Sequence, residues 1–398
     1  MIDFPRPIVR MKPKADAKAI RNGAPWVYGD DIVTDRRTKA LAAGTLVTLQ
    51  DSSRSDLGLA TINPSSRIMV RLIDKDPSCA IDRDWFAGKL VAALALRSRL
   101  FETPYYRLVH AEADGLPGVI IDRFGDVAVV QPNAAWAEAR LNDLVAALRE
   151  VCGVSCVLKN ASGRARGLEG LDDRSEVMCG SLDGPVPVPM NGATYFADLL
   201  EGQKTGLFYD QRPNHAFAAS LAKGADVLDV FSHVGGFGLA ALAHGAQSAL
   251  AVDGSQPALD LAQSGAARMG VSDRFSTQKG DAFKVMQALA DEGRDFNLVI
   301  ADPPAFAPHK RALQNGLTAY ARVAMMAAGL VRPGGYLVLC SCSHAADLTK
   351  FRQASLRGVA RAGRDVQIIH IGSAGPDHPT HPYLAESSYL KSVFLRLD

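Results

Sequence analysis

Two short runs near the end of the chain carry residue types that could perform covalent and acid–base chemistry. Ser341-Cys342-Ser343 ends one apolar run, and Asp302-Pro303-Pro304 ends another. A cysteine thiolate is a strong nucleophile, and a nearby carboxyl group can exchange a proton or form a hydrogen bond with a substrate. Free cysteine also packs well in buried strands, so Cys340 and Cys342 have a purely structural alternative.

A glycine-rich turn lies upstream of both runs. Residues 226–231 form an apolar run typical of a buried strand, and Ser232-His-Val-Gly-Gly-Phe-Gly238 leads from it into an Ala/Leu-rich helix. A parallel α/β sheet binds nucleotide-type ligands at such turns between strand and helix. The turn does not match the G-x-G-x-x-G pattern of dinucleotide enzymes, so by itself it indicates little.

Acidic residues follow the other predicted strands of this region. Asp253 ends the run 248–253 about 20 residues past the glycines, a spacing at which a carboxylate can bind ribose hydroxyls. Asp281 follows Gly280, and Asp302 ends the run 296–302. Each acid could instead cap a helix N-terminus. Together, the four strand ends bring polar groups to one edge of the predicted sheet, where a ligand site is expected.

In this order, the strand ends resemble those of a class I S-adenosylmethionine-dependent methyltransferase. The resemblance implies an α/β Rossmann-like domain with a seven-stranded sheet and S-adenosylmethionine as cofactor. Predicted strands 365–371 and 389–396 are joined without a helix, which predicts an antiparallel hairpin at the sheet edge. The cofactor-binding residues that the resemblance implies are Asp210, Arg212, Asp229, Phe231, Ser232, Gly235, Gly236, Phe237, Asp253, Ser255, Asp281, Ala282, Phe283, Asp302 and Pro303.

The run Ser341-Cys342-Ser343 is similar to the Thr/Ser-Cys-Ser of RNA cytosine-5 methyltransferases at the same strand end. That similarity implies Cys342 and Asp302 as catalytic residues. The Cys342 thiolate would add to C6 of cytosine, which makes C5 nucleophilic toward the cofactor's methyl group. Asp302 would support the base at N3 while negative charge builds up on the ring.

Release of the enzyme from such an adduct requires a base that removes the C5 proton. Many RNA cytosine-5 enzymes have a second cysteine just after the proline of the fourth strand's motif, and this chain has Ala305 there. Water, Cys340, His309 and His344 are the alternatives, and the sequence does not choose among them.

Two further segments resemble the bacterial large-subunit (23S) ribosomal RNA cytosine-5 methyltransferase family. They are Lys204-Thr-Gly-Leu-Phe-Tyr-Asp-Gln-Arg212 and the central segment from His110-Ala-Glu-Ala-Asp-Gly-Leu-Pro-Gly118 to Ile121-Asp-Arg-Phe-Gly125. The first would place Asp210 and Arg212 beside the cofactor, although the two could form a surface ion pair of little energetic value. The second is predicted to be a hairpin whose turn faces the site.

The N-terminal part differs from the rest in charge and in pattern. Lysine and arginine outnumber aspartate by four through Ala80, and glutamate is absent there. The predicted strands 45–49, 57–62 and 68–73 follow a short predicted helix at 16–21. This order resembles a PUA domain, a small β-barrel-like module that binds RNA, and its basic side chains would contact phosphates. A solvated basic face is the alternative.

The sequence predicts three parts: a β-rich PUA-like domain over 1–76, an α+β central domain over 77–190 and the methyltransferase domain over 191–398. In the central domain we expect helices at 85–101 and 135–151 and strands at 127–131 and 156–160. The proline-rich stretch 185–189 favours an edge or joining segment.

Global properties limit the classes of protein. The chain has 398 residues, a formal net charge of +2, 47% hydrophobic residues and six cysteines. No apolar run reaches the ~20 residues of a membrane span, and the start lacks a signal peptide's apolar core. We therefore expect a cytoplasmic enzyme with reduced cysteines, no membrane partner and no metal site; its oligomeric state, including a homodimer, stays open.

The sequence thus predicts S-adenosylmethionine-dependent methylation of cytosine C5 in RNA, with large-subunit ribosomal RNA as the implied substrate and rRNA processing as its role. One alternative is a guanine methyltransferase acting on ribosomal RNA, because Asp-Pro-Pro-x-Phe also resembles enzymes that methylate nitrogen. Another is a non-catalytic RNA-binding ribosome assembly factor. The modified nucleotide, and whether free RNA or an assembling subunit is the substrate, stay open.

Overall fold

A computed structural model describes residues 6–200 and 206–398 and divides the chain into two compact units. Of the described residues, the first unit contains 6–184 together with Pro376–Ser387, and the second contains the others. Of the two N-terminal parts that the sequence predicts, the described residues lie in the first unit except for 185–190, which belong to the second. The boundaries at 76 and 190 stay a prediction. No helix of the described residues is long and apolar enough to cross a membrane.

The first sheet of unit 1 has five strands and contains all three strands predicted for this region. Asp16 and Asp35 begin the two short helices, because each carboxylate accepts a hydrogen bond from a backbone N–H in the first turn. In sheet order the strands are β1 (Ile8–Arg10), β3 (Thr45–Gln50), β4 (Asp56–Ile62), β5 (Val70–Asp74) and β2 (Trp26–Val27), and the helices are α1 (Ala17–Arg21) and α2 (Arg36–Lys39).

The second sheet of unit 1 has the α+β pattern expected of the central domain. The segment between His110 and Val119 joins two antiparallel strands, which confirms the predicted hairpin. That its turn faces the site stays a prediction. In sheet order the strands are β10 (Glu176–Cys179), β9 (Cys156–Lys159), β8 (Val127–Pro132), β7 (Val119–Phe124) and β6 (Tyr105–His110), and the helices are α3 (Arg83–Leu100), α4 (Ala135–Glu138), α5 (Leu141–Cys152) and α6 (Arg164–Glu169).

The single helix predicted over 135–151 is wrong, because the chain breaks it into α4 and α5 at Ala139 and Arg140. Trp136 on α4 is buried, stacks on Phe86 of α3 and donates a hydrogen bond to the carbonyl of Pro117 at 2.9 Å. The apolar face of α5 is buried as well. The break lets both faces reach the core, which the helical periodicity of this stretch did not indicate.

Unit 2 begins with a two-stranded antiparallel ribbon of β11 (Val186–Met190) and β12 (Ala193–Ala197). The proline-rich stretch forms β11, so the predicted edge segment is confirmed. This arrangement suits proline because a two-stranded ribbon leaves one side of each strand without ladder hydrogen bonds.

A seven-stranded sheet forms the centre of unit 2, with five parallel strands followed by an antiparallel hairpin. This confirms the predicted sheet and its edge hairpin. In sheet order the strands are β15 (Phe275–Lys279), β14 (Ser248–Asp253), β13 (Asp226–Val230), β16 (Phe296–Ala301), β17 (Val331–Ser341), β19 (Lys391–Leu397) and β18 (Val366–Gly372).

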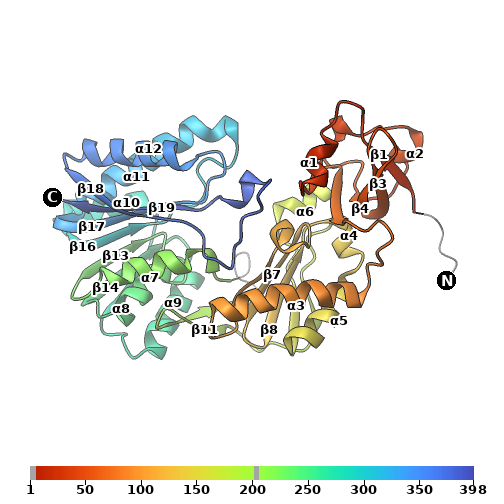
Figure 1. The fold of residues 1–398 in the computed structure, drawn as a ribbon. Coiled ribbons are helices and arrows are strands. Elements are labelled where there is room, and N and C mark those ends of the chain that lie inside the picture. The colour runs from red at the N-terminus through yellow and green to blue at the C-terminus, as the bar shows by residue number, and fades with distance from the viewer. Residues whose placement is uncertain (1–5, 201–205) are drawn as a thin grey trace. The chain divides into compact units, whose positions relative to one another are not determined.

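Helices cover both faces of this sheet (Figure 1). The helices α7 to α9 lie on one face and α10 to α12 on the other, as expected when each crossover between parallel strands contains a helix. Their bounds are α7 (Arg212–Ser220), α8 (Gly236–Ala243), α9 (Gln256–Arg268), α10 (Ala282–Asp291), α11 (Leu313–Gly329) and α12 (Leu348–Arg361).

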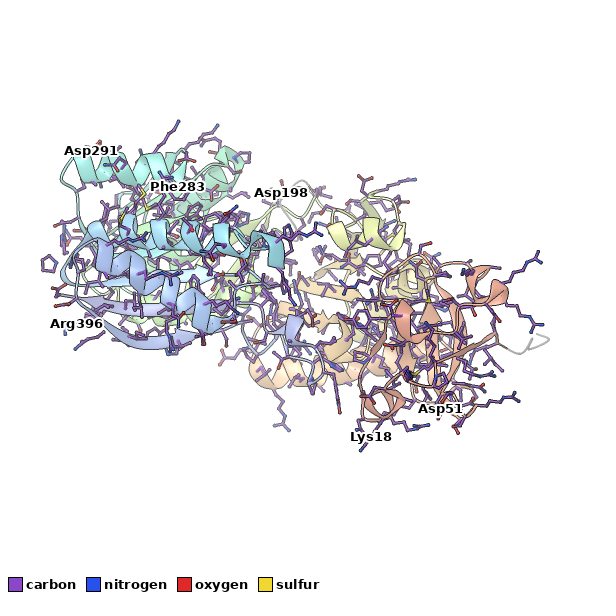
Figure 2. All side chains as sticks on the ribbon, turned by 90° about the horizontal axis from the view of Figure 1, so that it is seen from above. Lys18, Asp51, Asp198, Phe283, Asp291 and Arg396 are labelled. Carbon is purple, nitrogen blue, oxygen red and sulfur yellow. The ribbon has the colours of Figure 1, made fainter. Side chains whose placement is uncertain are left out.

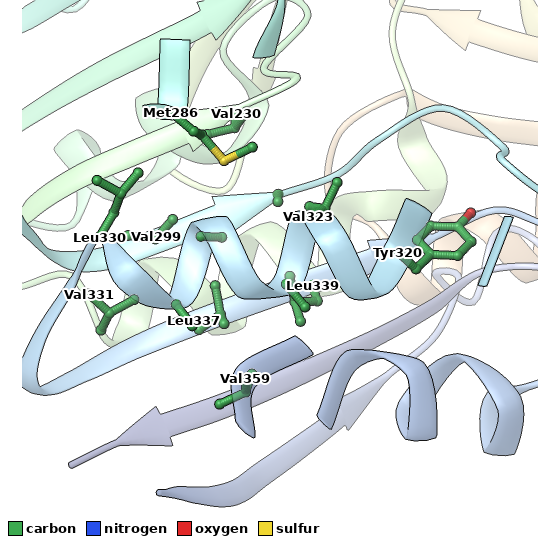
Figure 3. Packing of buried hydrophobic residues seen from close by; sticks show 14 of the residues in the cluster. Val230, Met286, Val299, Tyr320, Val323, Leu330, Val331, Leu337, Leu339 and Val359 are labelled. Carbon is green, nitrogen blue, oxygen red and sulfur yellow. The ribbon is translucent and has the colours of Figure 1, made fainter. Parts of the chain in front are cut away.

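The core of unit 2 is continuous from the strands into the helices that cover them. Val230, Val299 and Leu337 from three adjacent strands are fully buried and belong to one cluster with Val323 of α11 (Figure 3). The aliphatic side chains of this cluster hold α11 against the strands whose ends carry the candidate catalytic residues. Apolar packing therefore helps to position the ends of these strands, in addition to the polar contacts described below.

Gly358 of α12 marks a close crossing with α11. A Cβ atom at this position would lie 2.2 Å from the carbonyl oxygen of Ala321, whereas one at Gly329 of α11 would meet nothing within 4 Å. We expect Gly358→Ala to lower the free energy of unfolding by about 1–3 kcal/mol, because α12 must shift away from α11. Gly329→Ala is the matched control and should be neutral or slightly stabilising. Urea unfolding of both variants measures this, and equal effects would contradict the close crossing.

Candidate active site

The turn between β13 and α8 has an unusual backbone. Phe231, His233 and Gly235 all have positive φ values, 63°, 50° and 77°. Left-handed conformations cost energy in residues other than glycine and persist where the surroundings enforce them, commonly at ligand sites. At Gly236, a Cβ atom would lie 2.7 Å from the ring of His215, so only glycine fits there. The predicted glycine turn therefore forms a tight loop at the N-terminus of α8.

Buried polar atoms surround this loop. Among the described residues, Oδ1 of Asp229, Oγ of Ser232 and Nδ1 of His215 have no hydrogen-bond partner. A buried polar group without a partner costs about 1–3 kcal/mol. The tight loop and these unpaired atoms fit a polar ligand such as the expected cofactor. Sequence analysis did not identify His215, whose position facing Gly236 only the fold reveals.

Asp229 links the middle of the sheet to α8. Its side chain is fully buried, and its Oδ2 accepts a hydrogen bond from the backbone N–H of Gly238 at 2.9 Å. Its pKa is raised from 3.8 to about 7, chiefly by burial and also by the charge of Asp253, while hydrogen bonds from Gly238 and Phe237 act in the opposite direction. Asp229 is therefore the acid of this region that changes charge near neutral pH.

The predicted ribose acid, Asp253, lies at the end of β14. Its two carboxylate oxygens accept hydrogen bonds from the backbone N–H groups of His233 and Ser255, both at 2.8 Å. Ser255 begins α9 by accepting a hydrogen bond from the N–H of Ala258. A carboxylate oxygen has two lone pairs, so each oxygen keeps an acceptor position for a hydroxyl group. Helix capping by Ser255 and cofactor binding by Asp253 are compatible.

Asp281, Ala282 and Phe283 lie where β15 leads into α10. The Oδ1 of Asp281 accepts a hydrogen bond from the N–H of Lys284 at 3.0 Å, so this acid is a helix cap. Phe283 is half-buried, and the guanidinium of Arg322 lies 4.8 Å from the centre of its ring. Figure 2 labels Phe283 near the start of α10 and Asp291 at its end. An adenine-side role for this turn stays a prediction.

Hydrogen bonds hold the segment that ends at Arg212 against residues flanking the edge hairpin of the sheet. The side chain of Tyr389 donates a hydrogen bond to Oδ2 of Asp210 at 2.6 Å, and the carbonyl of Asp210 accepts one from the N–H of Gly375 at 3.0 Å. Asp210 is 9% exposed, which rules out the surface ion pair considered for it. The guanidinium of Arg212 lies 5.5 Å from the centre of the Tyr209 ring. Lys204 and Thr205, the first two residues of the motif, lie outside the described residues.

Gln211 connects this segment to the candidate catalytic acid, and sequence analysis missed it. Its Nε2 donates a hydrogen bond to Oδ2 of Asp302 at 2.8 Å, and its Oε1 accepts one from Asn214 at 2.6 Å. The signal was present, because Gln211 stands between Asp210 and Arg212 in the quoted motif. This amide donor holds the Asp302 carboxylate in place beside Pro303.

A tyrosine hydroxyl joins the loops that follow β16 and β17. The side chain of Tyr320 on α11 forms hydrogen bonds with the hydroxyls of Ser343 at 2.7 Å and Ser341 at 2.8 Å. Ser343 in turn accepts a hydrogen bond from the N–H of Ala307 at 2.9 Å. Both serines are fully buried. Their hydroxyls therefore fix the backbone on either side of Cys342 and tie it to the loop that begins at Asp302.

The two cysteines of this strand end have different environments. Cys340 is 1% exposed, and burial raises the pKa of its thiol well above the usual range. Cys342, one residue beyond the end of β17, is half-buried. A thiol is reactive only as its thiolate, so the buried Cys340 is poorly suited to act as either nucleophile or base. The structural alternative fits Cys340 better than Cys342.

Lys391, which sequence analysis also missed, begins β19 opposite Ser341. Its ammonium group is buried and donates hydrogen bonds to the backbone carbonyls of Ser343 at 2.6 Å and Ala346 at 2.7 Å. The available signal was a lysine within an apolar strand. Within the described part of the chain, no group of His, Cys, Asp and Glu residues has an arrangement suited to a metal ion.

Asp229→Asn should stabilise the protein increasingly as the pH rises. The pKa of Asp229 is raised from 3.8 to about 7 on folding, so its favourable contribution is complete below pH 3.8 and is lost as the pH rises through 7. Asparagine does not titrate and keeps an oxygen for the N–H of Gly238. The difference in free energy of unfolding between variant and wild type should increase by a few kcal/mol from about pH 4 to about pH 8. A constant difference in urea unfolding would contradict the raised pKa.

Tyr320→Phe should destabilise unit 2, because it leaves the buried hydroxyls of Ser341 and Ser343 without this partner. We expect the free energy of unfolding to fall by about 1–3 kcal/mol. Tyr336→Phe, in the same sheet but within the body of β17, is the matched control and should have a smaller effect. Guanidinium unfolding measures both, and an unchanged Tyr320→Phe protein would refute the linking role of this hydroxyl.

Comparison with known proteins identifies the family. The profile described as an S-adenosylmethionine-dependent methyltransferase matches residues 150–395, and that of a PUA-like domain matches residues 9–75. Ribosomal RNA large subunit methyltransferase I from Alteromonas mediterranea is 35% identical over 389 residues, which are 97% of each chain. The protein of the same name from Shewanella amazonensis is 34% identical over 394 residues, 98% of this chain and 99% of that protein.

Solved structures share the fold over the full length. A structure from Streptococcus mutans, provisionally named a SAM-dependent methyltransferase, has a TM-score of 0.82 at 18% identity and covers 98% of this chain and 100% of that chain. A second, provisionally named a methyltransferase and complexed with SAH, has the same TM-score and identity and covers 99% and 100%. The profile match over more than half of the chain and the curated relatives of similar length show that the protein belongs to the S-adenosylmethionine-dependent methyltransferases and carries an N-terminal PUA-like domain.

Proposed function

We propose that the protein methylates C5 of cytosine in large-subunit ribosomal RNA through a covalent bond between Cys342 and C6 of the base. The observation that carries this proposal is the arrangement at the ends of two adjacent parallel strands. Asp302 follows β16 and Cys342 follows β17, and Tyr320 links the two loops. A half-buried cysteine at the strand end next to that of an acid, in a methyltransferase sheet, suits a substrate base that must be activated by covalent addition.

The names of the relatives supply the substrate class. The proteins that match over nearly the full length are named Ribosomal RNA large subunit methyltransferase I, and the match includes the PUA-like part. We extend that substrate to this chain. Free ribosomal RNA and an assembling subunit are both compatible with it.

Exposed basic side chains support RNA binding by the PUA-like domain. Arg71 is held by Glu112 and Glu169, and Arg21 by Asp51, so these two arginines are engaged within the protein. Other basic residues of the domain are exposed and could contact phosphates without reading the sequence of the RNA. The exposed ones are Lys12, Lys14, Lys18, Arg36, Arg37, Lys39, Arg54, Arg67 and Lys75.

The proposed cofactor residues are those around the glycine loop and at the strand ends. The backbone N–H groups of the loop and the acceptors of Asp253 would hold S-adenosylmethionine, and Asp210, Arg212 and the Asp281 turn would surround it. Bound there, S-adenosylmethionine supplies an electrophilic methyl group. Asp229 would contribute indirectly, because its hydrogen bond to the N–H of Gly238 holds α8 in position.

The chain's own residues perform the remaining steps. The Cys342 thiolate forms a bond to C6, and the electron pair of the C5–C6 double bond makes C5 nucleophilic while Asp302 holds N3. After methyl transfer, a base removes the C5 proton, and the electrons of that bond restore the double bond and expel the thiolate. Among the bases considered, Cys340 is disfavoured by its burial and raised pKa. Water, His309 and His344 are the alternatives left.

The function is tested by incubating wild type and Cys342→Ala with unmodified ribosomal RNA and labelled S-adenosylmethionine, followed by nucleoside mass spectrometry. We expect 5-methylcytidine from wild type and at least a 1,000-fold lower rate from Cys342→Ala, roughly the loss on removing a nucleophile. Cys340→Ala is the matched control and should keep most of the activity, because the Cys340 side chain is buried and its thiol has a raised pKa.

Other products would decide against this function. A methylguanosine formed equally by wild type and Cys342→Ala would indicate the guanine methyltransferase and return Cys342 to a packing role. No label in any nucleoside, from a protein that binds RNA but does not bind S-adenosylmethionine in calorimetry, would indicate an assembly factor.

A further inference from the structure

Lys391 places a positive charge inside the protein at the proposed catalytic strand end. Its side chain is 7% exposed, and the acceptors of its ammonium group are the carbonyls of Ser343 and Ala346 rather than carboxylates. Burial of an ammonium group is unfavourable unless a partner compensates for it. The six residues that follow it in β19 are apolar except for Ser392 and Arg396, so an aliphatic side chain would fit this strand at lower cost.

Two roles could account for this lysine. In a purely structural role, it would only hold the loop from Ser343 to Ala346 against β19. In an electrostatic role, its positive charge would also stabilise an anion beside it. The groups that face it distinguish these roles, because only a charged role requires a neighbour that becomes negative during function.

Two groups favour the charged form of Lys391, namely Cys342 first and Asp347 second. Burial outweighs both and lowers the pKa of Lys391 to about 8, so the ammonium form still predominates at neutral pH. Asp347 is 54% exposed in its side chain and pairs with Lys350, so water and that lysine screen its charge. Cys342 is half-buried and is therefore the less screened partner.

Further titratable groups lie around Cys342 on neighbouring elements. Tyr320 of α11 has a raised pKa, chiefly because of burial, and Cys340 of β17 does as well. Asp302, which follows β16, raises the pKa of the Cys340 thiol further. His344, two residues after Cys342, is exposed. The attraction between two charges is mutual. The Cys342 thiolate therefore stabilises the Lys391 ammonium, and the ammonium stabilises the thiolate by the same free energy.

We propose that Lys391 is a positioning residue whose ammonium group stabilises the thiolate of Cys342 and so makes the nucleophile available near neutral pH. When the thiol ionises, its proton passes to solvent and the electron pair stays on sulfur, while the ammonium keeps its own proton. The two carbonyl contacts fix the ammonium beside the strand end. This inference deepens the proposed function and rests on Cys342 being its nucleophile.

The test measures the ionisation of Cys342 directly, without RNA or cofactor. Iodoacetamide alkylates thiolates, so the alkylation rate of Cys342 as a function of pH gives its titration midpoint. Cys340 and Cys342 fall in one tryptic peptide, and fragment ions in tandem mass spectrometry separate them. We compare full-length wild type, Lys391→Met, Lys391→Arg and, as matched control, Lys350→Met, which removes an exposed lysine of α12.

Lys391→Met should raise the midpoint by roughly one pH unit, which corresponds to about tenfold slower alkylation at pH 7. Lys391→Arg should keep most of the wild-type rate because it keeps the charge, and Lys350→Met should match wild type. In methyl transfer, Lys391→Met should lower kcat at neutral pH with little change in KM for RNA, and the loss should shrink at higher pH.

If the Lys391→Met protein unfolds at the wild-type temperature and keeps the wild-type titration midpoint of Cys342, the role of Lys391 is purely structural and the proposal is wrong. If the variants do not fold, the wild-type midpoint decides, because a value at or above the ordinary thiol pKa of about 8.5 overturns the proposal. The outcome is separate from that of the proposed function. A low midpoint in a protein that makes no 5-methylcytidine would support the coupling and refute the cytosine chemistry.

Discussion

The parallel alignment of adjacent strands is the constraint on which the candidate site depends. Parallel strands end at the same edge of a sheet, so β13, β14, β16 and β17 bring their polar ends together although up to about a hundred residues separate them in sequence. The buried cluster between these strands and α11 makes the edge rigid. Tyr320 and Gln211 then set the positions of Cys342 and Asp302 by hydrogen bonds at that edge.

The buried polar groups of this domain differ in whether they are neutral and hydrogen-bonded or ionisable. Ser341 and Ser343 are satisfied within the protein, so their contribution is to hold the backbone. Asp229 and Lys391 are ionisable groups whose charged forms burial disfavours, and each has a pKa near the neutral range. Such groups change charge at modest cost, which is a property found often at functional sites. The family membership shows a methyltransferase, and a role of these two groups in its chemistry stays a proposal.

Particular residues show which features of the fold and the site local sequence patterns predict. The apolar runs 226–231, 248–253 and 296–302 predicted the strands and their order in the motif, because burial on both faces of a parallel sheet requires such runs. The break at Arg140 was not predicted, since it depends on the burial of Trp136 against a helix distant in sequence. Gln211 stood within a recognised motif, yet its contact with Asp302 follows from the packing of α7 against the sheet and not from spacing.

By itself, the sequence determined the class of domain, the sheet with its edge hairpin, the glycine turn and the residues that end the strands. These features follow from local periodicity, turn chemistry and a recognisable motif order, which are properties of short segments. Only the tertiary structure decided that Cys340 is buried while Cys342 is half-exposed, that His215 faces Gly236 and that Lys391 lies beside Ser343. Those facts depend on burial and on contacts between residues far apart in the chain, which no local pattern records.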